Sequence, residues 1–345
     1  SFMFELIKTL TELPGMIGHE EPVQEFLQER WRPYVQHIHT TGVGNLLAKI
    51  GGHGPKLLIE AHADEIGVLV KGLSPEGLVW VAQKNALAGR PGRDLHIFGQ
   101  SCVIQTREGL VPGVFATLSG HVTPPEQKEK DVLGWGDFFV DIGATSEAEA
   151  REWGVQIGDG VIWSPPTRQV GHYIVGKAMD DRAGLAIMTA LLERLNPDEL
   201  AYELHFGSTV QEEIGLVGAF SLERDEQFDL AIAIDVGLAG DIPGVDTREI
   251  SCRLGGGPIL VHHDGSVHYD RRLTDSLTQL ADDGGIPIQH AVFPRYSSDG
   301  AALIKAGLPT ALVAFSTRYT HSPYEMVHEG DLEQCVDLLH RFVTH

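Results

Sequence analysis

The run DLAIAIDV occupies residues 229–236 and is nearly continuous in apolar side chains. A strand of this composition is buried on both faces, as in a parallel sheet that helices cover. Further strands are predicted before and after it, at 204–210, 258–261, 288–293 and 310–315. Helices are predicted between and beyond these strands, at 181–195, 215–222, 270–283, 298–306 and 331–343. The alternation favours an α/β domain with a mostly parallel sheet and helices on both faces.

Residues 67–166 differ from the rest of the chain in their pattern of apolar residues, glycines and prolines. Short apolar runs there are broken by Gly and Pro, which is typical of a small β-barrel. The segment 121–131 within it is polar and charged, and we expect it to be a loop. We therefore expect 3–66 and 167–345 to form one α/β domain, with 67–166 inserted as a β-barrel. The elements predicted ahead of the insertion are a helix at 21–31 and strands at 45–50 and 56–61.

The net charge, the cysteines and the lengths of the apolar runs limit which partners and which cellular compartment the chain is expected to have. The formal net charge is −22, which argues against nucleic acid or an anionic membrane as a partner. Three widely spaced cysteines form neither a disulfide framework nor a zinc pattern, which is typical of a reducing compartment. No apolar run approaches membrane-spanning length and no secretory signal is evident. We expect a cytoplasmic protein.

Charged side chains follow the predicted strands where these strands end. In an open α/β sheet, ligands bind at the carboxyl ends of the strands, so polar residues there are candidates for a site. Two histidines and several carboxylates have this placement, a mixture of nitrogen and oxygen that zinc or cobalt accepts. The candidate residues are His62, Asp64, Asp180, Glu212, Glu213, Asp235 and His321.

Most candidates also have an ordinary explanation when they are taken alone, although packing explains the lone charge of Asp235 poorly. An aspartate at 180 or 181 would cap the helix that follows, and glutamates at 212 and 213 would suit the first turn of a helix. A lone histidine in a loop is more often inert. Adjacent glutamates can also divide roles, one binding a metal and the other holding a proton. The sequence has no Walker loop, no Gly-x-Ser-x-Gly elbow and no His-Glu-x-x-His helix.

Four motifs together carry a specific resemblance: HADEIG at 62–67, MDDRAG at 179–184, EEIGL at 212–216 and YTHSP at 319–323. In these motifs, their order and their spacing, the chain resembles the dinuclear metallopeptidases of the tetrahedral-assembly (TET-type) aminopeptidase family. That group includes glutamyl, leucyl and lysyl aminopeptidases and members labelled endoglucanase. The resemblance covers nearly the whole chain.

The resemblance implies a centre of two divalent ions, zinc or cobalt with manganese as a further option. Asp180 would bridge both ions. Glu213 and His321 would complete the ligands of one ion, and His62 and Asp235 those of the other.

It also implies roles around the metals. Glu212 would be the general base that acts on a bridging water to release the N-terminal residue of a peptide, and Asp64 would orient His62. A cis peptide bond would join Asp180 and Asp181. The inserted barrel would be PDZ-like and would mediate contacts in a homo-oligomer of twelve subunits.

Other functions share part of this pattern. A deacylase or a carboxypeptidase of the wider dinuclear group would use much the same ligands. A glycoside hydrolase would use paired carboxylates without metal, which leaves His62 and His321 unexplained. A scaffold that kept the fold without activity is disfavoured because every candidate ligand is present. The segments at 255–258 and 296–300 depart from the family pattern, and we expect both to line the substrate side.

Overall fold

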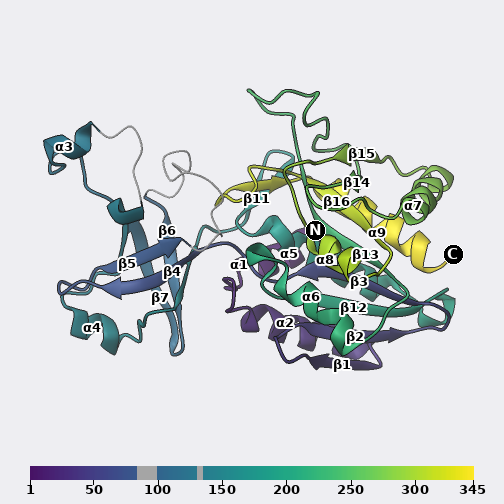
Figure 1. Cartoon of the computed structure of the whole chain (residues 1–345), viewed down its shortest axis with the longest axis horizontal. Helices are drawn as coiled ribbons and strands as arrows, with labels where there is room; N and C mark the ends of the chain where they lie inside the picture. The colour runs from purple at the N-terminus through teal and green to yellow at the C-terminus, as the bar shows by residue number, and fades with distance from the viewer. Residues whose placement is uncertain (84–98, 130–134) are drawn as a thin grey trace.

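The computed structural model of the chain describes residues 1–83, 99–129 and 135–345, and it has two parts, a sheet with helices and a separate barrel (Figure 1). Within the described residues the sheet has 11 strands. Its main path runs in the order β1 (His37–Thr40), β2 (Leu46–Gly51), β12 (Glu203–Thr209), β3 (Lys56–His62), β13 (Leu230–Leu238), β16 (Thr310–Arg318), β17 (Glu325–Val327), β11 (Tyr173–Gly176) and β10 (Arg168–Val170), while β14 (Ile259–His263) pairs with β16 and with β15 (Gln289–Val292).

The four central strands β12, β3, β13 and β16 are parallel to one another. Their carboxyl ends therefore meet at one edge, where Thr209 pairs with His62. The predicted α/β class is confirmed. The flanking pairs β1–β2 and β16–β17 are antiparallel, because short connections join these strands and a parallel pair needs a long crossover. The flanking strands β14 and β15 are parallel to each other.

Helices cover both faces of the sheet, as predicted. Alternate residues of β3 show this: Leu57 and Ile59 enter one apolar cluster, while Leu58 enters another. The first cluster is completed by α1 (Phe2–Glu12), α2 (Glu21–Trp31), α5 (Met179–Arg194), α7 (Arg271–Gly284) and α9 (Glu329–Val343), and the second by α6 (Val217–Asp225) and α8 (Asp299–Lys305). No helix in the described parts of the chain has the length and apolar character to cross a bilayer.

The second part is a closed barrel with its own apolar core. Every neighbouring pair of its strands is antiparallel, and β9 closes the barrel by pairing with both β4 and β6. The predicted inserted β-barrel is thus confirmed as a fold. Around the barrel the order is β4 (Val68–Leu73), β5 (Val79–Gln83), β8 (Phe139–Asp141), β7 (Gly109–Ala116), β6 (Ser101–Thr106) and β9 (Gly160–Trp163), with α4 (Glu147–Glu152) beside it.

Three elements differ from the sequence-based expectations. Helix α1 was not predicted, although Met3, Leu6, Ile7 and Leu10 are buried at helical spacing. The expected loop at 121–131 contains the short helix α3 (Pro125–Lys128), and its last two residues lie outside the described part. The helix expected at 215–222 begins later, at Val217, because Glu212–Ile214 forms a 3₁₀ turn ahead of it.

Arg182 ties the start of α5 to the N-terminal segment and to the residue after β3. Its side chain is fully buried and donates hydrogen bonds to four backbone carbonyls. The acceptors are Ala63 at 2.6 Å, Leu10 at 2.7 Å, Leu13 at 2.8 Å and Gly15 at 3.3 Å. These contacts hold the backbone just beyond the end of β3 in place.

We expect Arg182→Leu to lower the free energy of unfolding by about 3–5 kcal/mol, because it leaves buried carbonyl oxygens without a donor. The matched control is Arg194→Leu on the same helix, where the lost ion pair with Asp337 is exposed and contributes about 1 kcal/mol or less. Thermal unfolding of both variants measures the difference. Equal shifts in the two variants would contradict the role of Arg182.

Candidate metal centre

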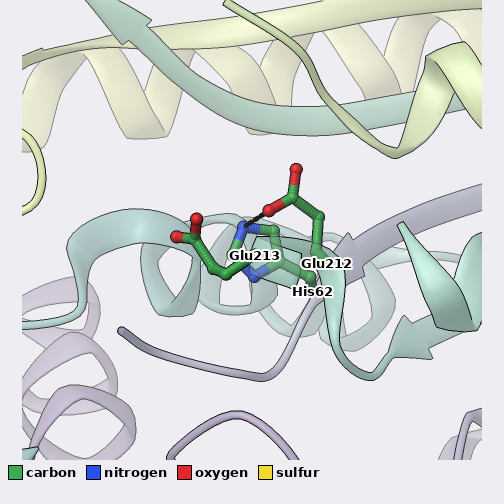
Figure 2. Close-up of side chains that lie close together, drawn as sticks. All are labelled: His62, Glu212 and Glu213. Atoms are coloured by element: carbon green, nitrogen blue, oxygen red, sulfur yellow. Dashed lines mark ion pairs between the residues drawn. The ribbon is translucent and has the colours of Figure 1, made fainter. Parts of the chain in front are cut away.

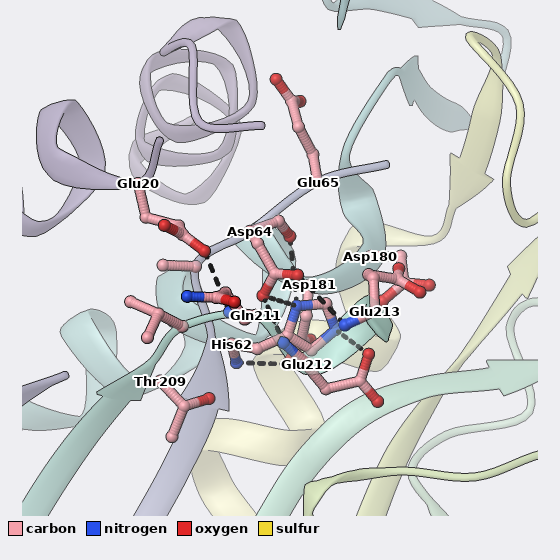
Figure 3. A network of polar contacts seen from close by, with 12 residues as sticks. Glu20, His62, Asp64, Glu65, Asp180, Asp181, Thr209, Gln211, Glu212 and Glu213 are labelled. Carbon is pink, nitrogen blue, oxygen red and sulfur yellow. Dashed lines mark hydrogen bonds and ion pairs between the residues drawn. The ribbon is translucent and has the colours of Figure 1, made fainter. Parts of the chain in front are cut away.

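The parallel edge of the sheet gathers the sequence-predicted site residues into one cluster. Figure 3 shows five of them: His62, Asp64, Asp180, Glu212 and Glu213. His62 ends β3, and Asp235 lies within β13. Asp180 lies in the first turn of α5, while Glu212 and Glu213 belong to the turn that follows β12. His321 completes the cluster from the segment after β16.

Asp180 contacts both histidines with separate oxygens. Its Oδ1 lies 2.9 Å from His62 Nε2, and its Oδ2 lies 3.4 Å from His321 Nε2. Two groups of possible ligand atoms, each lying within 4.8 Å of one another, therefore share this aspartate. The first group is His62, Asp180 and Asp235, and the second is Asp180, Glu213 and His321.

Glu212 and Glu213 are adjacent in sequence but serve different sides of the cluster. Figure 2 shows their side chains diverging around the ring of His62. Glu212 Oε2 lies 3.6 Å from His62 Nε2, whereas Glu213 Oε1 lies 3.2 Å from His321 Nε2. Both side chains can thus act on the same centre without sharing a position.

Asp64 holds His62 from the side away from Asp180 (Figure 3). The Nδ1 of His62 lies 3.1 Å from the Asp64 carbonyl oxygen and 3.3 Å from its Oδ1. With the Nδ1–H donating to Asp64, Nε2 is the ring nitrogen on the side of Asp180, and its lone pair would be available to a metal that displaces the proton there. The same carboxylate accepts the backbone N–H groups of Glu212 and Glu213, at 3.0 Å and 3.1 Å.

The backbone around the cluster is unusual. A cis peptide bond joins Asp180 and Asp181, as the family resemblance implies. Among the described residues, five that are not glycine have positive φ, and all five flank or include site residues. Such conformations cost free energy in L-residues and concentrate at functional sites. They are Ala178 (55°), Gln211 (52°), Leu216 (59°), Tyr319 (59°) and His321 (63°).

The cluster holds more carboxylates than its two imidazoles can balance. Burial raises the pKa values of Glu212, Glu213 and Asp235, and neighbouring carboxylates raise them further. Burial opposes protonation of His62 and His321, yet the surrounding carboxylates raise the pKa of both rings. A site that must otherwise retain protons to limit its negative charge is suited to divalent cations.

Asp180 is the exception among these carboxylates. Burial alone would raise its pKa, but hydrogen bonds from His321 and His62 outweigh burial and lower it. This carboxylate therefore stays ionised between the two rings. Imidazole nitrogen and carboxylate oxygen at mutual contact form a donor set that fits zinc and similar ions.

Three partners of the cluster were not assigned from the sequence. Asp181 does not cap α5 by its side chain; its Oδ2 accepts the backbone N–H of His62 at 3.1 Å. Ser298 Oγ donates to Asp235 Oδ2 at 2.6 Å, and Glu325 Oε2 accepts the backbone N–H of His321 at 3.2 Å. Asp181 had a sequence signal in its place in the MDDRAG motif, and Ser298 lies in the segment 296–300 that was expected to line the substrate side.

A further group of possible ligands, Glu203, His205 and Glu226, has a simpler explanation. The two ring nitrogens of His205 face different glutamates, at 3.0 Å and 3.7 Å, so they cannot converge on one ion. The glutamates also pair with Lys49 at 3.2 Å and with Lys56 at 3.3 Å. We interpret this group as a charge-balanced ion-pair network.

Comparisons with known proteins agree with this geometry. A family model described as M42 glutamyl aminopeptidase matches residues 44–338. The putative aminopeptidase FrvX of Escherichia coli K12 is 30% identical over 344 residues, which cover 99% of this chain and 94% of that protein. The resemblance drawn from the four motifs is confirmed.

Solved structures are similar over the same length. A TET aminopeptidase from a marine sediment archaeon of the Thaumarchaeota matches with a TM-score of 0.92 and 30% identity, covering 99% of this chain and 96% of its own. The Pyrococcus horikoshii TET1 peptidase, which can assemble into a tetrahedron or a large octahedral shell, matches with a TM-score of 0.89. Its identity is 29%, and the match covers 99% of both chains.

We expect zinc or cobalt, added to metal-free protein at about 100 times its Kd, to raise the thermal midpoint by roughly 5 °C, because the ions bind only the folded chain. Asp180→Asn should remove most of that rise, since Asp180 belongs to both ligand groups. Glu226→Gln, in the ion-pair network, is the control and should keep the full rise. An unchanged rise in Asp180→Asn would contradict the placement of the ions at this cluster.

Proposed function

The chain belongs to the M42 glutamyl aminopeptidase family, and on that basis we propose that it releases the N-terminal residue of peptides at a centre of two divalent metal ions. Family membership makes it a peptide hydrolase. The proposed ions are zinc or cobalt, with manganese as a further option, because imidazole and carboxylate suit all three. The proposed ligands are His62, Asp180, Glu213, Asp235 and His321.

One observation carries this proposal: Asp180 directs one oxygen toward each of the two histidines. A carboxylate in that position can bridge two ions, and each ion then gains one further carboxylate, from Asp235 or from Glu213. If only one ion were bound, one of the two groups of possible ligands would have no ion to coordinate.

Two such ions, when bound, supply Lewis acidity: they activate a bridging water and stabilise the negative charge that develops on the peptide carbonyl. Glu212 is the proposed general base. Its carboxylate would take a proton from the attacking water and deliver it to the nitrogen of the leaving peptide.

The side-chain preference is proposed from the cavity beside the cluster. This cavity has a volume of about 270 Å³ and is lined by Asp180, Glu212, Leu238, Arg295 and Tyr296 among others. Arg295 is the one lysine or arginine among the described lining residues, and no ion pair joins it to another described residue. Together with the glutamyl description of the family, this favours an acidic N-terminal residue in the substrate.

We propose the assembly from a similar solved structure, and the cellular compartment from the cysteines. Residues 67–166 would form an oligomerisation domain inserted into the catalytic domain of 3–66 and 167–345. Because the similar TET1 peptidase forms a tetrahedron or an octahedral shell, we propose a homo-oligomer, with twelve subunits as the expected number. Three buried free cysteines suit a reducing compartment, so we propose the cytoplasm.

The direct test is hydrolysis of aminoacyl-p-nitroanilides by the purified protein, before and after chelation and after zinc, cobalt or manganese is restored. We expect release that depends on metal and on a free α-amine, with glutamyl and aspartyl substrates the fastest because Arg295 lines the cavity beside the cluster. Arg295→Ala should lower the glutamyl-to-leucyl rate ratio about tenfold, the loss of one charged hydrogen bond.

The outcomes of this panel separate the alternatives. Activity on N-acetylated substrates would indicate a deacylase, and activity that survives chelation would exclude the metal mechanism. An active enzyme without acidic preference would overturn only the role of Arg295.

Glu212→Gln tests the general base. We expect kcat to fall by about 10²–10⁴-fold, because the amide cannot accept the proton. The metal content should stay at the wild-type value, since Glu212 is not among the proposed ligands. Near-normal kcat, or loss of metal, would show that the role assigned to Glu212 is wrong.

A further inference from the structure

The backbone N–H groups of Gln211, Glu212 and Glu213 all donate hydrogen bonds to buried carboxylates (Figure 3). The N–H of Gln211 donates to Glu20 Oε1 at 2.9 Å. The N–H groups of Glu212 and Glu213 donate to Asp64. The backbone of this turn is thus held from one side, which leaves the side chains of Glu212 and Glu213 free to reach the cluster.

Gln211 is the residue in this turn whose backbone most needs support. Its φ of 52° is left-handed, a conformation that an L-residue other than Asn or Asp rarely adopts. A different conformation at this point would change the direction in which the chain leaves β12 and enters the Glu212–Ile214 turn. The hydrogen bond to Glu20 favours the left-handed form, because other backbone directions would leave the N–H of Gln211 without an acceptor.

The Glu20 side chain is buried and held by hydrogen bonds, and it does not serve as a cap for the helix that follows it. It is 4% exposed and directly precedes α2, yet its side chain makes no capping hydrogen bond to that helix. Its Oε1 instead accepts a second backbone N–H, from Gly18 at 3.0 Å. The same segment is tied to the chain just after β3, because the N–H of Ile17 donates to the carbonyl of Glu65 at 3.2 Å.

We propose that Glu20 is a positioning residue that sets the direction of Glu212 by holding the backbone of Gln211. This inference rests on the proposed role of Glu212 as general base. Glu20 touches neither the proposed ions nor the substrate, and acts through the turn alone. It contributes an acceptor oxygen at a fixed place, 2.9 Å from the nitrogen of Gln211.

The acceptor oxygen, rather than the negative charge, is the part of Glu20 that the turn uses. Burial, with the nearby charge of Asp64, raises the pKa of Glu20 to about 7. A carboxyl that is partly neutral near physiological pH still accepts hydrogen bonds through its carbonyl oxygen. A glutamine offers an equivalent oxygen at the same reach, whereas an aspartate keeps the charge but is one methylene too short.

The test compares Glu20→Ala, Glu20→Asp and Glu20→Gln with Glu25→Ala, a control at an exposed glutamate on α2. Hydrogen exchange is measured first, on metal-free protein, for the peptide that spans residues 209–216. We expect at least tenfold faster exchange at the Gln211 amide in the Ala and Asp variants, and wild-type exchange in the Gln variant and the control.

Kinetics with saturating metal provide the second readout. We expect kcat to fall at least tenfold in Glu20→Ala and Glu20→Asp, with KM changed less than threefold and two ions still bound. Glu20→Gln should keep kcat within threefold of wild type. If Glu20→Ala does not fold, the Asp and Gln variants alone decide the question.

Two results would overturn the inference. One is wild-type exchange and kcat in the Ala or Asp variant, and the other is a Gln variant as impaired as the Ala variant. A wild-type enzyme without metal-dependent activity would overturn the proposed function instead. In that case the exchange measurement still decides whether Glu20 holds the turn.

Discussion

Several buried carboxylates lie close together at one edge of the parallel sheet, and the other groups of the site are arranged to stabilise their negative charge. Parallel strands bring the residues at their carboxyl ends together, and here these residues are mostly acidic. Asp180 is stabilised between His62 and His321, while Asp64 is stabilised by backbone N–H groups. The remaining excess of negative charge is the physical ground for proposing divalent cations at this cluster.

The place of the barrel in the chain follows from the same edge. Strand β3 ends at His62, and the barrel begins with Val68 shortly after it. The chain returns through β10 and β11 to α5, whose first turn holds Asp180. A buried ion pair between Lys177 and Glu65, 2.6 Å apart, joins the outgoing and returning segments beside the site. The segments that lead into and out of the barrel therefore meet beside the cluster.

Much of the fold and the proposed site was predictable because the signals are local. Apolar runs such as 229–236 mark the central strands, and a charged residue at a strand end marks the edge, as at Asp235. Helix α1 was missed although its apolar spacing is regular, because its burial depends on packing against α5 and α9, far along the chain. Ser298 and Glu20 could not be found in the same way, since each contacts a site segment distant in sequence and neither lies in a recognisable motif.

The sharing of Asp180 between two ions is tested most directly by X-ray diffraction from zinc-loaded crystals at the zinc absorption edge. We predict two anomalous peaks in each subunit, each about 2.0–2.2 Å from a different carboxylate oxygen of Asp180, the usual zinc–carboxylate distance. One peak would lie beside His62 and Asp235, and the other beside Glu213 and His321. A single peak, or two peaks that do not share Asp180, would contradict the dinuclear centre.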